Sequence, residues 1–191
     1  KVFPNLPVAL ECNTPIRMEV QGKKQGLINA QVARLQDRIL VRSATLISAV
    51  SREVAEFLLE CHPKLDPSSV IVNPNGVDTL RFRDRGFGAR VDLGLPADAV
   101  VIGFAGNFRP WHRIDLLIQA FLTLEASNIR LLILGSGPAS LESSLRRLAT
   151  SDKSSRVRFA GPVSFLNMPL FLSACDILTA PHGGTRGARF H

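Results

Sequence analysis

The sequence contains few of the residues that build a nucleic-acid surface. It has no tyrosine and one tryptophan, and aromatic side chains make up 6% of its 191 residues. The lysines and arginines are scattered along the chain, so the stacking platforms of single-strand binders are not evident. The net charge of +7 favours anionic partners, such as nucleotides or anionic lipid headgroups. We therefore do not expect a nucleic-acid partner.

Cysteine is scarce as well. Cys12, Cys61 and Cys175 lie far apart, and none belongs to a Cys-x-x-Cys pair. This spacing indicates neither a zinc site nor a disulfide framework and is typical of free thiols in a reducing compartment. The four histidines also lack metal-ligand spacing, so we expect no metal ion.

Long apolar runs are missing too. No window reaches about 18 consecutive apolar residues, and no charged-then-apolar leader opens the chain. We therefore expect a cytoplasmic protein. The chain begins with Lys1 instead of methionine, and residues 183–191 complete neither a strand nor a helix. These features predict a fragment that is incomplete at both ends.

Three common signatures of nucleotide and hydrolase chemistry are not found. The absence of Gly-Lys-Ser/Thr excludes a P-loop, and the absence of Gly-x-Ser-x-Gly excludes the usual hydrolase elbow. Gly135-x-Gly137 lacks the third glycine and the later acidic residue of a dinucleotide fingerprint. The sequence therefore does not indicate an NAD-binding site.

The most informative stretch that is present runs from Val100 to Phe121. Val100–Ala105 is a continuous apolar run, which predicts a strand buried on both faces of a parallel sheet. A loop follows with Gly106, Arg109, His112 and Arg113. The helical spacing of the next apolar residues predicts a helix over 114–125. A basic loop between a strand and a helix start can bind phosphate, and it can also simply turn the chain.

The same alternation continues to the end of the chain. Apolar runs predict strands over 131–134, 156–159 and 176–180, and helical spacing predicts helices over 139–149 and 164–174. Two of these strands end in glycine-containing loops, Gly135-Ser136-Gly137 and Gly161-Pro162. Strands that alternate with helices predict an α/β fold with a parallel sheet and right-handed crossovers.

The first part of the chain shows the same pattern with shorter elements. A strand that begins near Leu6 leads to the polar residues Glu11 and Asn13, which could line a cleft or lie in water. A helix follows over about 25–42, then a strand over 44–50, a helix capped by Ser51 and a strand over 69–72. Glycines and alternating charges over 81–94 then mark a domain boundary.

Three arginines of the first predicted helix follow each other at intervals of four residues, namely Arg34, Arg38 and Arg42. They form one basic stripe on the helix. The stripe could be a solvated face, or it could contact an anionic membrane surface. The sequence leaves both interpretations open.

Several segments, in this order and at these distances, resemble the retaining family-four glycosyltransferases (glycosyl transferases group 1) of GT-B fold. The most specific are the hinge Pro74-Asn75-Gly76-Val77-Asp78 and the turn Leu134-Gly135-Ser136-Gly137-Pro138. The others are Val50-Ser51, Gly103–Gly106, Ile114–Phe121, Val157–Gly161 and Ala174–Asp176 with Pro181. The resemblance covers nearly the whole chain, from Leu6 to about His182.

The resemblance implies an α/β fold of GT-B type, with two Rossmann-like domains and parallel sheets. Residues 1–80 would be the C-terminal part of the acceptor domain, and residues 81–98 would be the linker. Residues 99–191 would be a truncated donor domain that binds a nucleotide-diphosphate sugar of UDP or GDP type. No cofactor is implied.

Site residues follow from the same resemblance. The donor diphosphate would lie against Gly106, Asn107, Arg109, His112 and Arg113, beside the loop with Gly135 and Gly137, and the nucleobase against Pro162 and Val163. Glu11 and Asn13 fall near the strand end where the family often has a histidine that faces the reaction centre. They are candidate catalytic residues.

The sequence departs from the family at two places. Asn107 and His112 stand where the family commonly has an arginine and a lysine that reach the diphosphate, and Arg113 stands in the place of a second glycine. We expect Arg109 to supply the missing fixed charge and His112 to contribute in a pH-sensitive way. The family's paired glutamates would follow the strand over 176–180, but no acidic residue follows Asp176. We therefore expect this chain alone to be inactive.

The resemblance implies a glycosyltransferase that retains the configuration of the transferred sugar. Its acceptor would be a carbohydrate, a lipid-linked compound or another small molecule, and a peripheral contact to an anionic membrane stays open. Two alternatives stay open: a non-catalytic module that binds nucleotide diphosphates, and a GT-B sugar-nucleotide epimerase. The second alternative would need acid and base residues that the sequence does not show.

Overall fold

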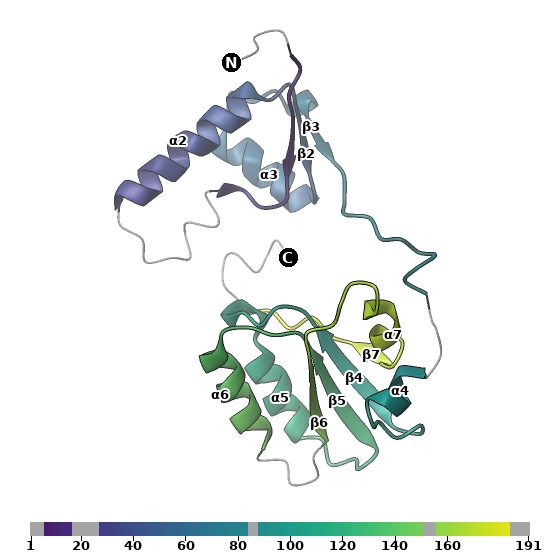
Figure 1. Ribbon diagram of the computed structural model, residues 1–191. Helices are drawn as coiled ribbons and strands as arrows, with labels where there is room; N and C mark the ends of the chain where they lie inside the picture. The colour runs from purple at the N-terminus through teal and green to yellow at the C-terminus, as the bar shows by residue number, and fades with distance from the viewer. Residues whose placement is uncertain (1–5, 17–26, 84–87, 151–155, 184–191) are drawn as a thin grey trace. The chain divides into compact units, whose positions relative to one another are not determined.

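The computed structural model describes residues 6–16, 27–83, 88–150 and 156–183, in two compact units that meet in the sequence between Gly76 and Val77 (Figure 1). The first unit contains the described residues up to Gly76, and the second unit spans Val77–Gly183. Each unit is built on a parallel sheet. The predicted α/β class with parallel sheets is therefore confirmed.

The first unit contains three parallel strands in the order β1-β2-β3. Its elements are β1 (Ala9–Cys12), α2 (Leu27–Ser43), β2 (Leu46–Ala49), α3 (Arg52–Cys61), the 3-10 turn η1 (Pro67–Ser69) and β3 (Val70–Val72). The Ser51 hydroxyl accepts a hydrogen bond from the Val54 N–H at 3.3 Å, which confirms the predicted N-cap of α3. Val54 and Leu58 of α3 pack on Ile47 of β2 to form the core of this unit.

Helix α2 forms where the sequence predicts it, but its apolar spacing does not mark its buried face. Among residues 31–43, whose side chains the structure describes, the buried residues are Ala33, Asp37 and Val41, whereas Leu35 and Ile39 are 58% and 57% exposed. Small Ala33 lies on the inner face, and the Asp37 carboxylate pairs with Nε2 of His62 at 2.8 Å. A buried hydrogen bond thus replaces the apolar contact that the periodicity indicates.

The second unit contains four parallel strands in the order β6-β5-β4-β7. Its elements are α4 (Gly88–Asp92), β4 (Val100–Ala105), the 3-10 turn η2 (Pro110–His112), α5 (Ile114–Leu122), β5 (Ile129–Leu134), α6 (Ala139–Ala149), β6 (Val157–Gly161), α7 (Met168–Leu172) and β7 (Ile177–Leu178). The chain adds strands in one direction from β4 to β6 and then crosses to the other side of β4. The strand order therefore reverses at β4.

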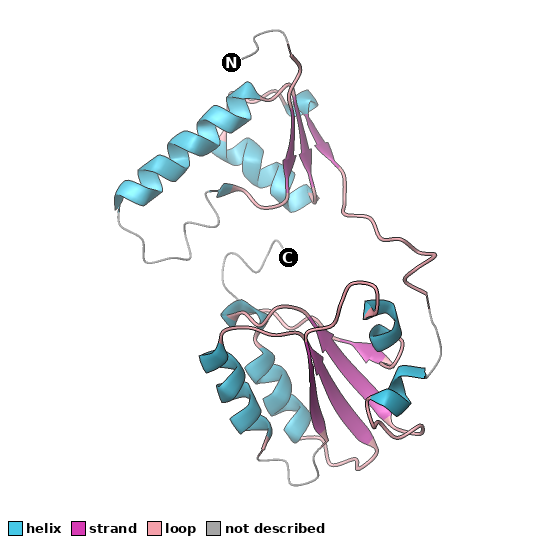
Figure 2. Ribbon diagram, in the orientation of Figure 1, coloured by secondary structure: helices cyan, strands magenta, loops and turns pink. Residues whose placement is uncertain are grey.

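The central strand β5 shows why this sheet is covered on both faces. Leu132 and Leu134 belong to one apolar cluster, and their neighbours Leu131 and Ile133 belong to the other. Side chains alternate between the two faces of a strand, so a continuous apolar run fills two cores. Helices α5 and α6 cover one face, and α4 and α7 lie at the other (Figures 1 and 2).

Element boundaries differ in places from the predicted ones. Helix α5 ends at Leu122 instead of residue 125, where the Thr123 hydroxyl donates to the Ala120 carbonyl at 2.8 Å. The predicted linker over 81–98 contains helix α4, and Ala89, Leu93 and Leu95 are buried in the core of the second unit. The glycines and charged residues of this segment give no sign in the sequence that it is buried. Because these apolar side chains pack in the core, the segment is part of the folded unit.

A buried arginine holds the α4 side of the second unit together. The Arg90 guanidinium, 3% exposed, donates to the carbonyls of Ala97, Ala99 and Ala174 at 3.0 Å each. It also donates to Oδ2 of Asp176 at 2.7 Å, and the same oxygen accepts the Val101 N–H at 2.7 Å. One side chain therefore satisfies carbonyls from separate segments, which a buried charge requires.

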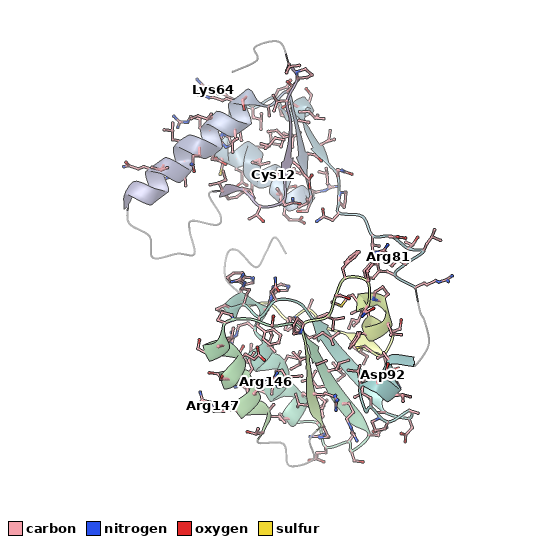
Figure 3. All side chains as sticks on the ribbon, in the orientation of Figure 1. Cys12, Lys64, Arg81, Asp92, Arg146 and Arg147 are labelled. Atoms are coloured by element: carbon pink, nitrogen blue, oxygen red, sulfur yellow. The ribbon has the colours of Figure 1, made fainter. Side chains whose placement is uncertain are left out.

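Replacement of Arg90 by methionine tests this network. The variant leaves three carbonyls without their donor, so we expect a loss of about 3 kcal/mol in the free energy of unfolding. The protein's one tryptophan, Trp111, lies in the second unit, so its fluorescence during urea unfolding measures this unit. Arg147→Met is the control, because Arg147 extends from α6 into solvent (Figure 3). A similar midpoint for both variants would contradict the assigned role of Arg90.

Candidate functional site

The candidate site lies where the strands of the second unit end. The loops after β4, β5 and β7 leave the same edge of the sheet, because parallel strands have their carboxyl ends at one edge. The strand order reverses beside β4, and open α/β sheets bind ligands at such a switch point. The loop after β4 holds Asn107, Arg109, His112 and Arg113, so the predicted basic loop lies at this edge.

Backbone contacts hold the loops after β4 and β5 close together. The Phe108 N–H donates to the Ser136 carbonyl at 2.8 Å, and the Gly106 N–H donates to the Leu134 carbonyl at 3.1 Å. A Cβ atom on Gly135 would collide with the Gly106 carbonyl oxygen, and one on Gly137 would lie 2.6 Å from Cβ of Phe108. These glycines are therefore needed for the contact between the two loops.

A cleft of about 340 Å³ opens between the two loops. The sequence predicts three of its lining residues as site residues, namely Asn107, Arg109 and Gly137. The other lining residues are Phe108, Ser136 and Pro138. Phe108 is 1% exposed and anchors the loop in the core. The sequence contains a signal for this role, because Phe108 is an apolar residue between the polar residues Asn107 and Arg109.

Arg109 combines exposure with a fixed position. It precedes the turn η2 in an extended conformation, with φ −130° and ψ 150°. Its guanidinium carbon lies 5.9 Å from the ring centroid of Trp111, so the cation rests over an aromatic ring at the edge of the cleft. Arg109 therefore offers an accessible positive charge beside the cleft, and its predicted contact with phosphate stays a prediction.

The ring of His112 is fixed by a short hydrogen bond and by aromatic contacts. Its Nδ1 lies 2.6 Å from the backbone carbonyl oxygen of Asn107. The ring packs against Phe104, Trp111 and His182, with centroids 6.0, 6.0 and 5.4 Å away. The sequence did not single out His182 as a neighbour of this loop, because the two histidines are 70 residues apart.

Arg113 has a structural role at the start of α5. Its φ of 40° places it in the left-handed region that favours glycine, and it directly precedes α5. Its guanidinium binds the Asp115 carboxylate, with Nη2 to Oδ2 at 2.9 Å. This hydrogen bond, more than any other contact, holds the pKa of Asp115 below its usual range. The charge of Arg113 is thus already paired at the start of the helix.

The remaining donor-side residues lie beyond β6. Gly161 has a φ of 76°, its carbonyl accepts the Gly135 N–H at 2.7 Å, and Pro162 is exposed. Val163 packs against the apolar cluster that contains Leu134. The structure places this loop beside the loop after β5, and the predicted contact of Pro162 and Val163 with a nucleobase stays a prediction.

Glu11 and Asn13 lie in the first unit, at the end of β1. Both are exposed, and the Asn13 amide donates to Oε1 of Glu11 at 3.1 Å. The structure thus shows a hydrogen-bonded pair of exposed polar side chains at the end of β1. Their predicted catalytic role stays a prediction.

The described residues show little metal or thiol chemistry. Among them, no group of three or more histidine, cysteine or acidic side chains could hold a metal ion. Cys12, Cys61 and Cys175 form no disulfide bond. Burial, followed by the nearby carboxylate of Asp37 or Asp176, raises the pKa values of Cys12 and Cys175 to about 11. These two thiols therefore stay protonated near neutral pH and are poor nucleophiles.

Comparison with known proteins gives a consistent picture. A family model described as "Glycosyl transferases group 1" matches residues 99–189. Over 160 residues, the chain is 32% identical to the D-inositol 3-phosphate glycosyltransferase of Stackebrandtia nassauensis, covering 76% of this chain and 35% of the relative. The enzyme of that name from Streptomyces scabiei is 34% identical over 157 residues, with 74% and 34% covered. The chain thus spans about a third of the length of these relatives.

Solved structures show the same fold. Anabaena HepE in complex with UDP and glucose superposes with a TM-score of 0.73 at 18% identity, covering 92% of this chain and 46% of HepE. WaaG, a glycosyltransferase involved in lipopolysaccharide biosynthesis, has a TM-score of 0.66 at 16% identity, covering 98% of this chain and 54% of WaaG. These similarities confirm the predicted GT-B type of fold.

Proposed function

This chain belongs, through residues 99–189, to the glycosyl transferases group 1 family, and we propose that the whole protein transfers a sugar from a nucleotide-diphosphate sugar to an acceptor. The proposal includes a UDP or GDP donor and retention of configuration at the transferred sugar. HepE has been solved with UDP and with UDP-glucose, which supports a donor of this kind.

The observation that carries the proposal is the cleft between the loops after β4 and β5. It lies at the carboxyl ends of parallel strands, and its wall contains an exposed arginine, Arg109, fixed over Trp111. An arginine guanidinium is suited to the oxygens of a diphosphate. The cleft therefore offers the chemistry that a departing nucleoside diphosphate needs.

The proposed contribution to catalysis is electrostatic. As the bond between the sugar and the diphosphate breaks, negative charge builds up on the leaving oxygens, and in this proposal Arg109 and His112 of the loop after β4 stabilise it. The start of α5 adds a smaller effect, because the Asp115 carboxylate already occupies part of its positive end. These roles need no cofactor. Glu11 and Asn13 remain proposed catalytic residues.

The acceptor is proposed from chemistry and from the relatives. A carbohydrate, a lipid-linked compound or a small polyol would suit the family, and the relatives' names make D-inositol 3-phosphate the first compound to test. A non-catalytic diphosphate-binding module and an epimerase are the alternatives. Release of UDP from UDP-glucose only when an acceptor is present would distinguish transfer from both.

The diphosphate role of Arg109 is tested by Arg109→Ala. Loss of a charge-assisted contact to phosphate should weaken UDP or GDP binding by about 1–3 kcal/mol, which is roughly 5- to 150-fold in the dissociation constant. Isothermal titration calorimetry measures this change. Arg147→Ala is the matched control, since it removes an exposed arginine of α6 outside the cleft. An unchanged affinity in Arg109→Ala would exclude this residue from the diphosphate site.

We also propose a peripheral contact of α2 with an anionic membrane. Arg34, Arg38 and Arg42 are all exposed, and the exposed residues Val32, Leu35 and Ile39 lie on the outer side of the same helix. The one acidic residue of α2, Asp37, is buried against His62. The outer surface of α2 therefore combines apolar and purely cationic side chains, as in interfacial helices. No helix among the described residues is long and apolar enough to span a bilayer.

Sedimentation with vesicles tests this contact. Each arginine near an anionic surface contributes about 1 kcal/mol, so neutralising all three should weaken binding by roughly a hundredfold. At low salt, the wild-type protein should sediment with phosphatidylglycerol vesicles. The variant R34Q/R38Q/R42Q should stay in the supernatant. Neutral phosphatidylcholine vesicles and Arg147→Gln are the controls. If the triple variant sediments like the wild type, the stripe is a solvated face.

A further inference from the structure

The hydrogen bond between His112 and Asn107 determines which nitrogen of the ring carries a proton. A carbonyl oxygen only accepts hydrogen bonds, so Nδ1 of His112, 2.6 Å from the Asn107 carbonyl, must be the donor. A neutral imidazole holds one proton. Nε2 of the neutral ring therefore has a lone pair and no hydrogen, and it cannot donate to a phosphate oxygen.

The ring is held in this orientation from three sides. Phe104 of β4, Trp111 of η2 and His182, which follows β7, all contact it. These contacts, together with the hydrogen bond to Asn107, oppose a flip that would exchange the two nitrogens. The only route by which this ring can donate from Nε2 is to gain a second proton.

Several ionisable groups belong to the loop or contact the ring. Arg109 and Arg113 belong to the same loop and are cationic, and His182 is a second ionisable ring at 5.4 Å. Asp115, in the first turn of α5, is engaged by the Arg113 guanidinium through Nε and Nη2. A bound diphosphate would add negative charge beside the loop, and a nearby negative charge favours the protonated form of an imidazole.

We propose that His112 couples binding of the nucleoside diphosphate to uptake of one proton. This inference rests on the proposed donor site and adds a regulation to it. The neutral ring takes a proton from solvent at Nε2 as the diphosphate binds, and the new Nε2–H donates to a phosphate oxygen. The proton returns to solvent when the diphosphate leaves. In this cycle Arg109 is charged at all times, and His112 is charged only while the diphosphate is bound.

The sign of the pH effect follows from this cycle. Binding consumes a proton, so affinity is highest at low pH and falls as the pH rises and protonation becomes unfavourable. The dissociation constant rises by at most about tenfold per pH unit for one coupled proton. The apparent affinity for donor and product would thus follow the pH of the surroundings.

Calorimetry in several buffers measures the proton directly. UDP is titrated into the full chain at neutral pH in PIPES, HEPES and Tris, which differ in ionisation enthalpy. The slope of observed enthalpy against buffer ionisation enthalpy gives the number of protons exchanged. UDP itself exchanges protons on binding, so the relevant quantity is the difference between wild type and two variants.

The variants are His112→Lys, which carries a permanent charge, and His112→Gln, which carries none. We expect wild type to take up as much as one more proton than either variant. His112→Lys should retain affinity at high pH, and His112→Gln should bind about tenfold more weakly at low pH and show only the pH dependence that UDP itself contributes. A merely structural role of His112 would not give this contrast between the variants.

Two failures can be told apart. If UDP binds the wild type and both variants with equal slopes, the proton coupling is excluded and the donor site stands. If neither UDP nor GDP binds the wild type at any pH, the proposed function fails, and the coupling fails with it.

Discussion

The candidate site depends on the close approach of two backbone loops in the second unit. The Gly106 carbonyl lies where a Cβ atom of residue 135 would be, and Phe108 lies where a Cβ atom of residue 137 would be. Glycine at 135 and 137 allows the loops to pair through the hydrogen bond from Phe108 to Ser136. Burial of the Phe108 ring then fixes the polar residues on either side of it, Asn107 and Arg109, at the cleft.

Charge in the loop after β4 is distributed unevenly. Arg113 is paired with Asp115 and supports the start of α5, whereas Arg109 lies at the cleft over Trp111. His112 donates from Nδ1 to the backbone and keeps Nε2 for a proton that a ligand could recruit. Of three basic side chains within five residues, Arg113 thus supports the fold, Arg109 lies at the cleft, and His112 is the one for which we propose proton uptake with the ligand.

The sequence predicted those parts of the structure that depend on a single periodic pattern. The apolar run over 100–105 became a strand with two buried faces, and the helix over 139–149 has the predicted bounds. Asn107, Arg109 and Gly137 were predicted at the site, because a parallel sheet brings the ends of its strands to one edge.

Contacts between distant residues could not be predicted in the same way. Arg90 lies in a segment rich in charges and glycine, and only the fold brings it to Asp176, 86 residues later. Helix α2 buries Asp37 because His62 of another segment meets it, a partner that periodicity does not show. The pair of His112 and His182 depends on the return of the chain to β4 through β7. Such pairs need three-dimensional information.

The central claim is that a nucleoside diphosphate binds in the cleft between the loops after β4 and β5. An NMR titration of the ¹⁵N-labelled chain with UDP and GDP tests this claim most directly, because each backbone amide reports on its own surroundings. We expect the largest shifts at residues 106–109, 112–113 and 136–137, and smaller ones in the first unit. Shifts that gather elsewhere in the chain, or no shifts at saturating nucleotide, would contradict the account.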